Sequence, residues 1–226
     1  MKTQPDFAKL DRYKLSSYRA YNEELVERYD SSIWLRVFQA SRWDSAIVSQ
    51  LGAGLGELRV LDVGCATGRL LCKLADSGVR QLAGADLAPR ILEVARKKLR
   101  DQGAEAELRT ADAEDRLPWP DGSFDALLLT GVFHHFFRPR DALQEAGRVL
   151  RPGGRIILVD PWFPSPLRGV ANFYLRLFPH DGDCSFYSPA AVVRMLQSLG
   201  WAEGDYRRVG LCCFLVHARK RSDPPE

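Results

Sequence analysis

The chain has 226 residues, of which 46% are hydrophobic and 27% are charged, and its formal net charge at neutral pH is +3. This length allows one substantial core, or a core with a small lid. The small net charge, without a long run of Lys and Arg, argues against nucleic acid as the main partner. No apolar run approaches the roughly 18 to 20 residues of a membrane span, and no signal-peptide pattern follows Met1. We therefore expect a cytoplasmic protein without stable membrane insertion.

Residues 1–54 predict an N-terminal helical cap in two or three pieces. Tyr18, Tyr21, Leu25 and Tyr29 recur at helical spacing, and polar residues fill the gaps. These aromatic side chains fit either ordinary packing on a core or a helix that crosses the mouth of a site. A glycine-rich stretch at 52–56 ends the cap, so we place the main domain at 55–226.

The main domain alternates between strand and helix patterns, as in a parallel sheet with helices on both faces. The expected strands are 59–63, 80–85, 105–110, 124–130 and 155–160, and the expected helices are 68–77, 89–100 and 139–150. An aromatic insert at 161–187 follows, with a helix near 166–178. A helix capped by Ser188 and Pro189 runs to Leu199. Two strands, 201–208 and 211–219, close the chain as an antiparallel pair at one edge.

The stretch from Val60 to Leu70 reads as a buried strand, a small-residue turn and a helix. Such a turn presents backbone N–H groups and a helix N-terminus to a ligand. Its glycines, Gly64 and Gly68, allow a positive φ and close approach of a ligand. An ordinary tight turn remains the alternative. The spacing differs from the G-x-G-x-x-G pattern of nicotinamide enzymes, and no phosphate-binding P-loop pattern occurs.

Carboxylates stand at the ends of the expected strands. Asp86 closes the second strand, where it can accept hydrogen bonds from two ribose hydroxyls. Asp112 follows the third strand and can accept from an exocyclic amine, while the Ala113 N–H serves a ring nitrogen. Leu87 can flank an adenine. The alternatives are a helix cap for Asp86 and a solvated loop carboxylate for Asp112.

Several ordered motifs across residues 58–160 resemble the class I S-adenosylmethionine-dependent methyltransferases. The resemblance is greatest to the small-molecule group with a type 11 methyltransferase domain, which includes the ubiquinone and menaquinone biosynthesis enzymes. The matching motifs are LDVGCATG at 61–68, GADL at 84–87, ADAE at 111–114, LPWPDGSFD at 117–125 and VLRPGG at 149–154. The resemblance implies a Rossmann-like, seven-stranded, mostly parallel sheet with an antiparallel C-terminal hairpin, and S-adenosylmethionine as cofactor.

The residues assigned to the cofactor on this resemblance lie in the turn and at the strand ends. They are Asp62, Gly64, Cys65, Ala66, Gly68, Asp86, Leu87, Asp112, Ala113 and Thr130. Asp62 either holds the backbone of the turn or reaches the methionine amine through water. The family motif has glycine where this chain has Ala66. Alanine is sterically tolerated there if its φ is negative, and on that condition we expect cofactor binding to survive.

His134 and His135 follow the fourth strand, near the expected point of methyl transfer. Either can take a proton from a substrate hydroxyl, but adjacent side chains point in different directions, so at most one is expected to act. The alternative is a histidine that contacts the cofactor or caps a turn. The same caution applies to His180 and Asp183, which are too few for a metal site. The five cysteines lack C-x-x-C spacing, so we predict no metal.

Methyl transfer by in-line displacement depends mainly on alignment and on exclusion of water, so a lid over the site is informative. The candidates for the substrate site and lid are aromatic: Tyr18, Tyr21, Trp162, Phe163, Phe173, Tyr174 and Tyr187. They favour a small apolar or aromatic acceptor, although ordinary core packing explains many of them. The alternatives are a protein-substrate methyltransferase and a catalytically silent protein that binds the cofactor. Thr130-Gly131-Val132-Phe133 lacks the Pro-Pro pattern of nucleic-acid amino methylation. No pattern predicts the oligomeric state.

Overall fold

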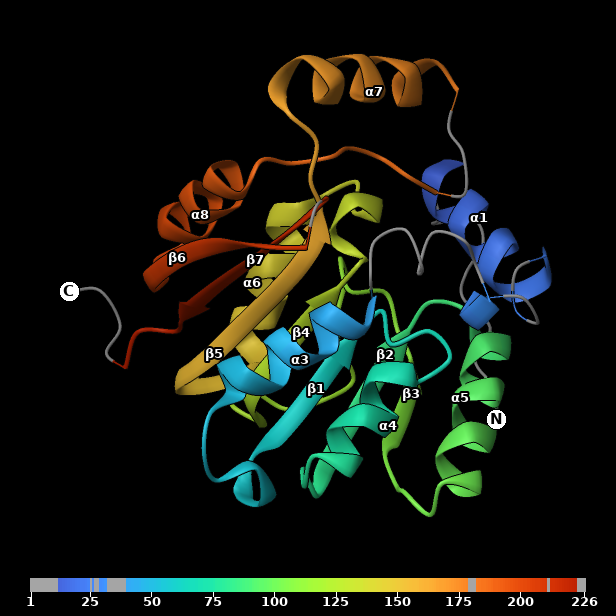
Figure 1. Ribbon diagram of the computed structural model, residues 1–226, viewed down its shortest axis with the longest axis vertical. Coiled ribbons are helices and arrows are strands. Elements are labelled where there is room, and N and C mark those ends of the chain that lie inside the picture. Colours follow the sequence, from blue (N-terminus) through green and yellow to red (C-terminus); the bar gives the residue numbers. More distant parts are fainter. Residues whose placement is uncertain are drawn as a thin grey trace.

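The computed structural model describes residues 12–24, 26, 29–31, 40–178, 182–210 and 212–222. Its centre is a seven-stranded sheet in the order β3-β2-β1-β4-β5-β7-β6 (Figure 1). The strands are β1 Arg59–Val63, β2 Gln81–Asp86, β3 Glu107–Thr110, β4 Phe124–Thr130, β5 Leu150–Pro161, β6 Ala202–Val209 and β7 Cys213–Arg219. The neighbours β3, β2, β1, β4 and β5 pair in parallel in that order, and β7 pairs antiparallel with both β5 and β6. The predicted fold class is confirmed.

Helices cover both faces of the sheet (Figure 1). Helices α3 Ala40–Leu51, α4 Arg69–Asp76 and α5 Pro89–Asp101 pack on one face, and α6 Pro139–Val149 and α8 Pro189–Ser198 pack on the other. Neighbouring strand residues alternate between the two cores: Leu61 and Leu127 lie in one core, Val60 and Leu128 in the other. Strands buried on both faces explain why these segments are almost wholly apolar.

Strand β5 is longer than predicted. The sequence predicted a helix to residue 150 and a strand at 155–160, but β5 begins at Leu150 and includes Pro152, Gly153 and Gly154. A register shift between Phe124 and Ala126 on β4 accommodates the extra residues as a bulge. Gly153 has a φ of 73°, and a Cβ on Gly154 would lie 2.8 Å from a backbone oxygen. The motif therefore turns the chain inside a strand.

The start of α8 follows the predicted cap. The Ser188 side chain accepts a hydrogen bond from the Ala191 N–H, and Pro189 occupies the first turn. Short 3-10 segments at Leu55–Glu57 and Phe133–His135 connect the larger elements.

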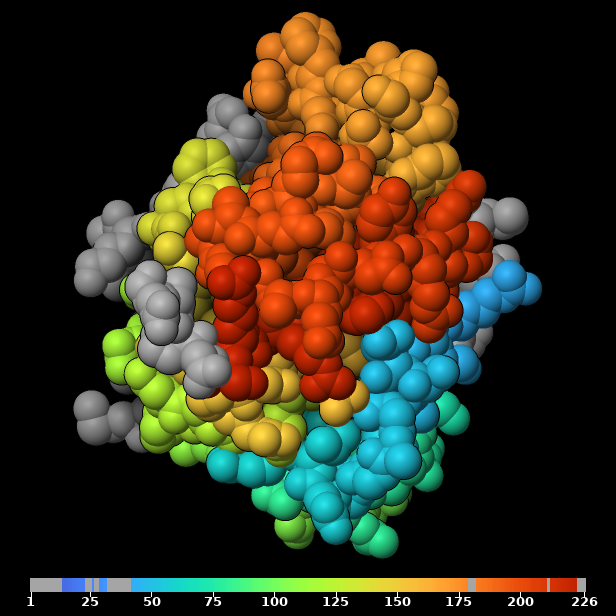
Figure 2. Space-filling model, turned by 90° about the vertical axis from the view of Figure 1, so that its left-hand side faces the viewer, coloured from blue at the N-terminus to red at the C-terminus, as the bar shows by residue number. Residues whose placement is uncertain are grey.

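The remaining helical segments lie at the carboxyl edge of the parallel strands (Figure 1). They are α1 Arg12–Arg19, a π-helical turn at Ala20–Glu24, a 3-10 turn at Tyr29–Ser31, and α7 Ser165–Leu177. Helix α7 projects from the body of the molecule (Figures 1 and 2). The boundary expected at residue 54 stays a prediction. Within the described residues, no helix is both long and apolar enough to cross a membrane.

Candidate active site

A pocket opens at the carboxyl edge of the parallel strands, where β1, β2, β3 and β4 end. It encloses about 720 Å³ of empty space, including a part that is open to solvent. Six of the residues assigned to the cofactor from the sequence line it: Gly64, Ala66, Asp86, Leu87, Asp112 and Ala113. The other four, Asp62, Cys65, Gly68 and Thr130, are not among its lining residues.

The turn after β1 needs glycine at its first position. Gly64 has a φ of 76°, and a Cβ there would lie 2.5 Å from the Val132 side chain. The Gly64 and Cys65 N–H groups donate to the Ala85 carbonyl at 2.8 and 3.0 Å. The turn is thus bound to β2 and pressed against the segment after β4, and a larger residue at Gly64 has no room.

Gly68 serves the packing of the turn rather than the pocket surface. It is the N-cap of α4, with a φ of 73°, and a Cβ there would lie 3.0 Å from the Cβ of Ala95 on α5. The missing side chain lets α4 start close to α5.

Ala66 adopts a backbone conformation that the sequence analysis did not expect. Its φ is 46°, so the condition of a negative φ is wrong. A left-handed conformation costs an L-residue roughly 1–2 kcal/mol, which explains why glycine is common at this point of the motif. The Ala66 N–H donates to a carboxylate oxygen of Asp86 at 2.9 Å, and this bond helps to hold the strained residue.

Asp86 uses both carboxylate oxygens to organise the turn. One oxygen accepts from the Ala66 N–H, and the other accepts from the Ala88 N–H at 3.0 Å. Burial raises the pKa of Asp86, while these N–H groups act in the opposite direction. Carboxylate oxygens have several lone-pair sites, so Asp86 can also accept hydrogen bonds from a ligand in the pocket.

Lys14 on α1 lies in the pocket wall, a position that no sequence pattern indicated. Its Nζ lies 2.5 Å from a carboxylate oxygen of Asp112 and 2.9 Å from one of Glu114. Burial would lower the pKa of Lys14, but the two carboxylates outweigh it and raise that pKa. The second Asp112 oxygen accepts from the Glu114 N–H at 2.9 Å. Asp112 is therefore shared between the cap and the pocket.

Two buried polar atoms behind the pocket have no hydrogen-bond partner among the described residues: Asp62 Oδ1 and Thr130 Oγ1. Both residues were assigned to the cofactor from the sequence. Burial raises the pKa of Asp62 to about 7, and the positive charge of Arg69 only partly opposes this. Asp62 therefore gains or loses its proton close to neutral pH.

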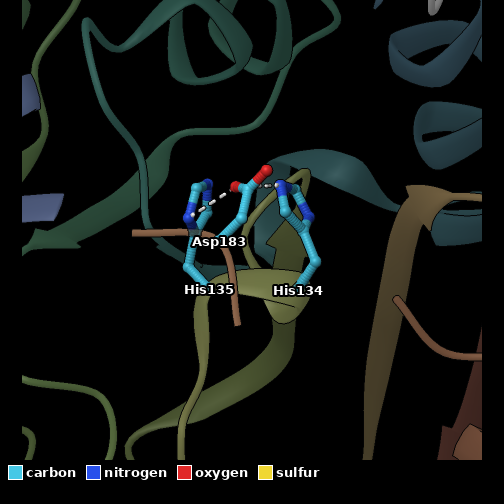
Figure 3. Close-up of side chains that lie close together, drawn as sticks. All are labelled: His134, His135 and Asp183. Carbon is cyan, nitrogen blue, oxygen red and sulfur yellow. Dashed lines mark ion pairs between the residues drawn. The ribbon is translucent and has the colours of Figure 1, made fainter. Parts of the chain in front are cut away.

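His134 and His135 lie on either side of Asp183, which comes from the segment between α7 and α8 (Figure 3). His134 Nδ1 lies 2.9 Å from buried Asp160 Oδ1, and its Nε2 lies 3.5 Å from Asp183 Oδ1. His135 Nδ1 lies 3.2 Å from the same Asp183 oxygen. Burial would lower the pKa of His134, but Asp160 and Asp183 outweigh it and raise that pKa. Burial and the neighbouring His134 lower the pKa of His135 to about 4.

The two histidines differ in their position relative to the pocket. His135 lines the pocket, whereas His134 is not among the lining residues. Tyr21 also lines the pocket, and its hydroxyl lies 3.4 Å from His135 Nε2. His134 stacks on Phe186, and its carbonyl accepts from the Cys184 N–H at 2.8 Å.

Of the seven aromatic residues assigned to the substrate site and lid, Tyr21 alone lines this pocket. Tyr18 is buried, Trp162 stacks under the Arg208 guanidinium at 4.1 Å, and Phe163 and Tyr187 contact Phe186 and Phe133. Phe173 and Tyr174 are 65% and 54% exposed on α7.

The remaining lining residues were not predicted as site residues. They are Lys14, Ser17, Tyr29, Val63, Ala85, Ala111, Glu114, Gly131, Val132 and Phe136. Glu114 and Ala111 stood inside a quoted motif, and Gly131 and Val132 directly follow the predicted strand. For Lys14 and Ser17 no local signal exists, since their place depends on how the cap folds back.

The sequence predicted no metal, but the fold unites residues that the sequence analysis considered in separate pairs. His134, His135 and Asp183 each present one possible ligand atom, and these atoms lie within 4.8 Å of one another. A protonated His134 would account for the same convergence, because Asp160 and Asp183 lie on either side of its ring and raise its pKa. His180 lies outside the described residues.

Comparison with known proteins identifies the family to which this chain belongs. A family model described as a methyltransferase domain matches residues 61–158. The chain is 36% identical over 157 residues to the demethylmenaquinone methyltransferase of Thermus thermophilus, covering 69% of this chain and 70% of that protein. The chain belongs to the S-adenosylmethionine-dependent methyltransferases. The demethylmenaquinone methyltransferase of Tropheryma whipplei is 34% identical to this methyltransferase over 189 residues. The match covers 80% of this chain and 75% of the Tropheryma whipplei protein.

Solved structures share the fold of this methyltransferase. A SAM-dependent methyltransferase from Aquifex aeolicus aligns with a TM-score of 0.67 at 24% identity, covering 86% of this chain and 96% of its own. Magnesium protoporphyrin IX methyltransferase from Synechocystis PCC 6803, solved with bound SAH, aligns with a TM-score of 0.73 at 18% identity, covering 92% and 99%.

The cofactor of the methyltransferase is S-adenosylmethionine, and the pocket suits it. Gly64 lets the turn approach Val132 closely, and both residues line the pocket. Acidic groups at the ends of β2 and β3 match the hydroxyl and amine donors of a nucleoside.

Proposed function

We propose that this methyltransferase transfers the methyl group of S-adenosylmethionine to a small apolar or aromatic acceptor by in-line displacement. The observation that carries the proposal is one continuous pocket that contains Asp86 and Asp112 in one part and His135 with Tyr21 in another. The cofactor, when bound, supplies a methyl group on a sulfonium. The relatives named demethylmenaquinone methyltransferases support an acceptor with an aromatic ring, and a quinone precursor is the first candidate to test.

In this proposal, the residues of the pocket divide the work of binding. The turn at Gly64 and Ala66 offers backbone to the methionine part, Asp86 accepts from the ribose hydroxyls, and Asp112 with Ala113 contacts the base. Leu87 lies against the adenine. Asp62, Cys65, Gly68 and Thr130 support these residues from behind the pocket surface, since none of them lines it.

His135 is the proposed proton acceptor for the acceptor molecule. It lines the pocket, and its low pKa keeps it neutral at physiological pH, with a nitrogen free of a proton. His134 is a positioning residue, because Asp160 and Asp183 bind it on both sides. Alignment of the reactants contributes most of the acceleration, so loss of His135 should lower the rate without abolishing it.

No step in this account uses a metal ion. We expect dialysis of the enzyme against EDTA to leave the methyl-transfer rate and the thermal midpoint unchanged. A rate that falls after dialysis and returns with added Zn²⁺ or Mn²⁺ would assign His134, His135 and Asp183 as metal ligands instead.

Transfer of a radiolabelled methyl group to a panel of acceptors tests the proposal. The panel contains a demethylated naphthoquinol, simple phenols, and a peptide mixture as the protein-substrate alternative. We expect label in the naphthoquinol and phenol fractions only. Label in peptides would favour the protein-substrate alternative. Binding of S-adenosylmethionine without label in any acceptor would favour a silent cofactor-binding protein.

A further inference from the structure

Helix α7 exposes an apolar surface that the catalytic site does not use. Eight large hydrophobic side chains are exposed among the described residues, and six of them belong to α7 or directly follow it. These six form the α7 stripe: Leu167, Val170, Phe173, Tyr174, Leu177 and Phe178. Figure 2 shows the atoms of α7 projecting beyond the body of the molecule.

The stripe has the spacing of one helical face. Its members recur at intervals of three and four residues, which places them along one side of a helix. In most surface helices this side faces the core, yet Leu175 is the one buried residue of α7. The apolar face of α7 therefore points outward, and a contiguous exposed apolar patch marks an interaction site.

Specific contacts fix this outward orientation. The Asn172 side chain bonds to both backbone groups of Phe186, donating to its carbonyl at 3.0 Å and accepting from its N–H at 2.8 Å. The Arg168 guanidinium donates to the Phe163 carbonyl at 3.0 Å. The polar side of α7 is thus bound to the protein, and the apolar stripe is held away from it.

The charges of the helix identify the partner. Helix α7 contains Arg168 and Arg176 and no acidic residue. An outward apolar face with aromatic and aliphatic side chains, on a helix whose charged residues are all positive, is the pattern of a helix that lies in the surface of an anionic bilayer. A second copy of this chain would bring the same positive charges against each other, which disfavours self-association through this face. With 13 residues and a length of about 20 Å, the helix is too short to span a bilayer.

We propose that α7 docks this methyltransferase on an anionic lipid surface. The helix lies beyond the carboxyl edge of the sheet (Figure 1), and residues at this edge line the pocket. The segment that follows α7 contacts the site directly, because Asp183 lies against both histidines and a Cβ on Gly182 would overlap Ser17 of the pocket wall. Docking thus brings the site to a bilayer where an apolar acceptor dissolves, a consequence that rests on the proposed function.

Co-sedimentation of the full chain with lipid vesicles tests the docking without cofactor or acceptor. One set of vesicles contains equal parts of phosphatidylglycerol and phosphatidylcholine, and the other contains phosphatidylcholine alone. We expect binding to the anionic set, weakened by added salt. The double variant Phe173→Ser/Leu177→Ser should bind at least about tenfold more weakly, since each buried side chain of this size changes an equilibrium about tenfold or more. Tyr206→Ser, an exposed aromatic on β6, is the matched control and should bind like the wild type.

A variant without one of the positive charges of α7 measures the electrostatic contribution to vesicle binding. Arg176→Gln should weaken binding to anionic vesicles about fivefold, while Arg100→Gln, at an arginine on α5 that is also exposed, should not. Equal binding of wild type and the Phe173→Ser/Leu177→Ser variant, or no binding of either, would overturn the proposal. Dimers of the wild type that this variant dissociates, without vesicle binding, would assign the stripe to a second copy.

Cofactor binding measured by calorimetry shows that each variant is folded. Because vesicle binding needs no methyl transfer, a negative result here leaves the acceptor assay unaffected, and a negative acceptor assay leaves the docking result unaffected.

Discussion

The part of the pocket that follows β1, β2 and β3 differs in origin from the part formed by α1, the π-helical turn and the histidines after β4. The first part is made of short turns, in which Gly64, Ala66, Asp86 and Asp112 lie directly at strand ends. The second part joins residues that are far apart in the chain: Lys14 meets Asp112 across 98 positions. The part proposed for the cofactor is thus set by local chain geometry, while the part proposed for the acceptor depends on tertiary packing.

The largest expected effect comes from a substitution in the turn after β1, which belongs to the part of the pocket set by local chain geometry. Gly64→Val should weaken S-adenosylmethionine binding by at least about 100-fold, because a side chain there meets Val132 at 2.5 Å and overpacking combines with strained backbone. Isothermal titration measures the affinity. Gly103→Val, at a φ of 68° with nothing within 4 Å of the added Cβ, is the control for backbone strain alone and should bind the cofactor normally. Normal binding by a folded Gly64→Val protein would show that the turn is only structural.

The next effect concerns the part that depends on tertiary packing. Lys14→Met should lower the free energy of unfolding by about 3 kcal/mol, since it leaves the buried carboxylate of Glu114 and the half-buried carboxylate of Asp112 without their cation. Urea denaturation measures the loss, and adding Glu114→Gln should recover part of it. Lys97→Met, which breaks an exposed pair with Asp101, should cost less than about 0.5 kcal/mol.

The contact of Lys14 with Asp112 and Glu114 also predicts how the cost of Lys14→Met varies with pH. Because the pKa of Lys14 is raised in the folded protein, its contribution is complete below its ordinary pKa of 10.5 and is lost only as pH rises above that value. The cost of Lys14→Met should therefore be the same from pH 6 to pH 9. A cost that falls away within this range would contradict the ion pair.

The pH profile of methyl transfer tests the proposed role of His135 as proton acceptor, with a smaller expected effect. With a His135 pKa of about 4, the rate should be flat through neutral pH and should fall only as the pH approaches 4, where His135 gains a proton. His134→Gln removes a neighbour that lowers this pKa, so the fall should move to higher pH, towards the ordinary value of 6.5. A profile that His134→Gln does not move would remove His135 from the proton-transfer role.

The smallest expected effect is a gain. Ala66→Gly should raise the free energy of unfolding by about 0.5–1 kcal/mol, because glycine adopts the φ of 46° without steric cost. Ala88→Gly is the matched control at a φ of −96° and should lower stability by a similar amount. Thermal denaturation of both variants shows whether each substitution stabilises or destabilises the protein.

The sequence was sufficient for the sheet, its two faces and the turn after β1, since short apolar runs and glycine turns are local signals. It did not reveal the left-handed φ of Ala66, because an alanine gives no sign of strain forced by its neighbours. It also missed the meeting of Asp183 with His134 and His135, which lie about 50 positions earlier in the chain. Lys14 escaped detection because nothing in its neighbourhood distinguishes it from a surface lysine.

The central claim is that one pocket binds the cofactor at Asp86 and Asp112 and directs its methyl group towards His135. A crystal structure with S-adenosylhomocysteine tests it most directly. We predict the ribose hydroxyls on Asp86, the adenine between Leu87 and Asp112, and the sulfur on the side of the pocket that holds His135. A nucleoside bound elsewhere, or a sulfur pointing away from His135, would contradict the account.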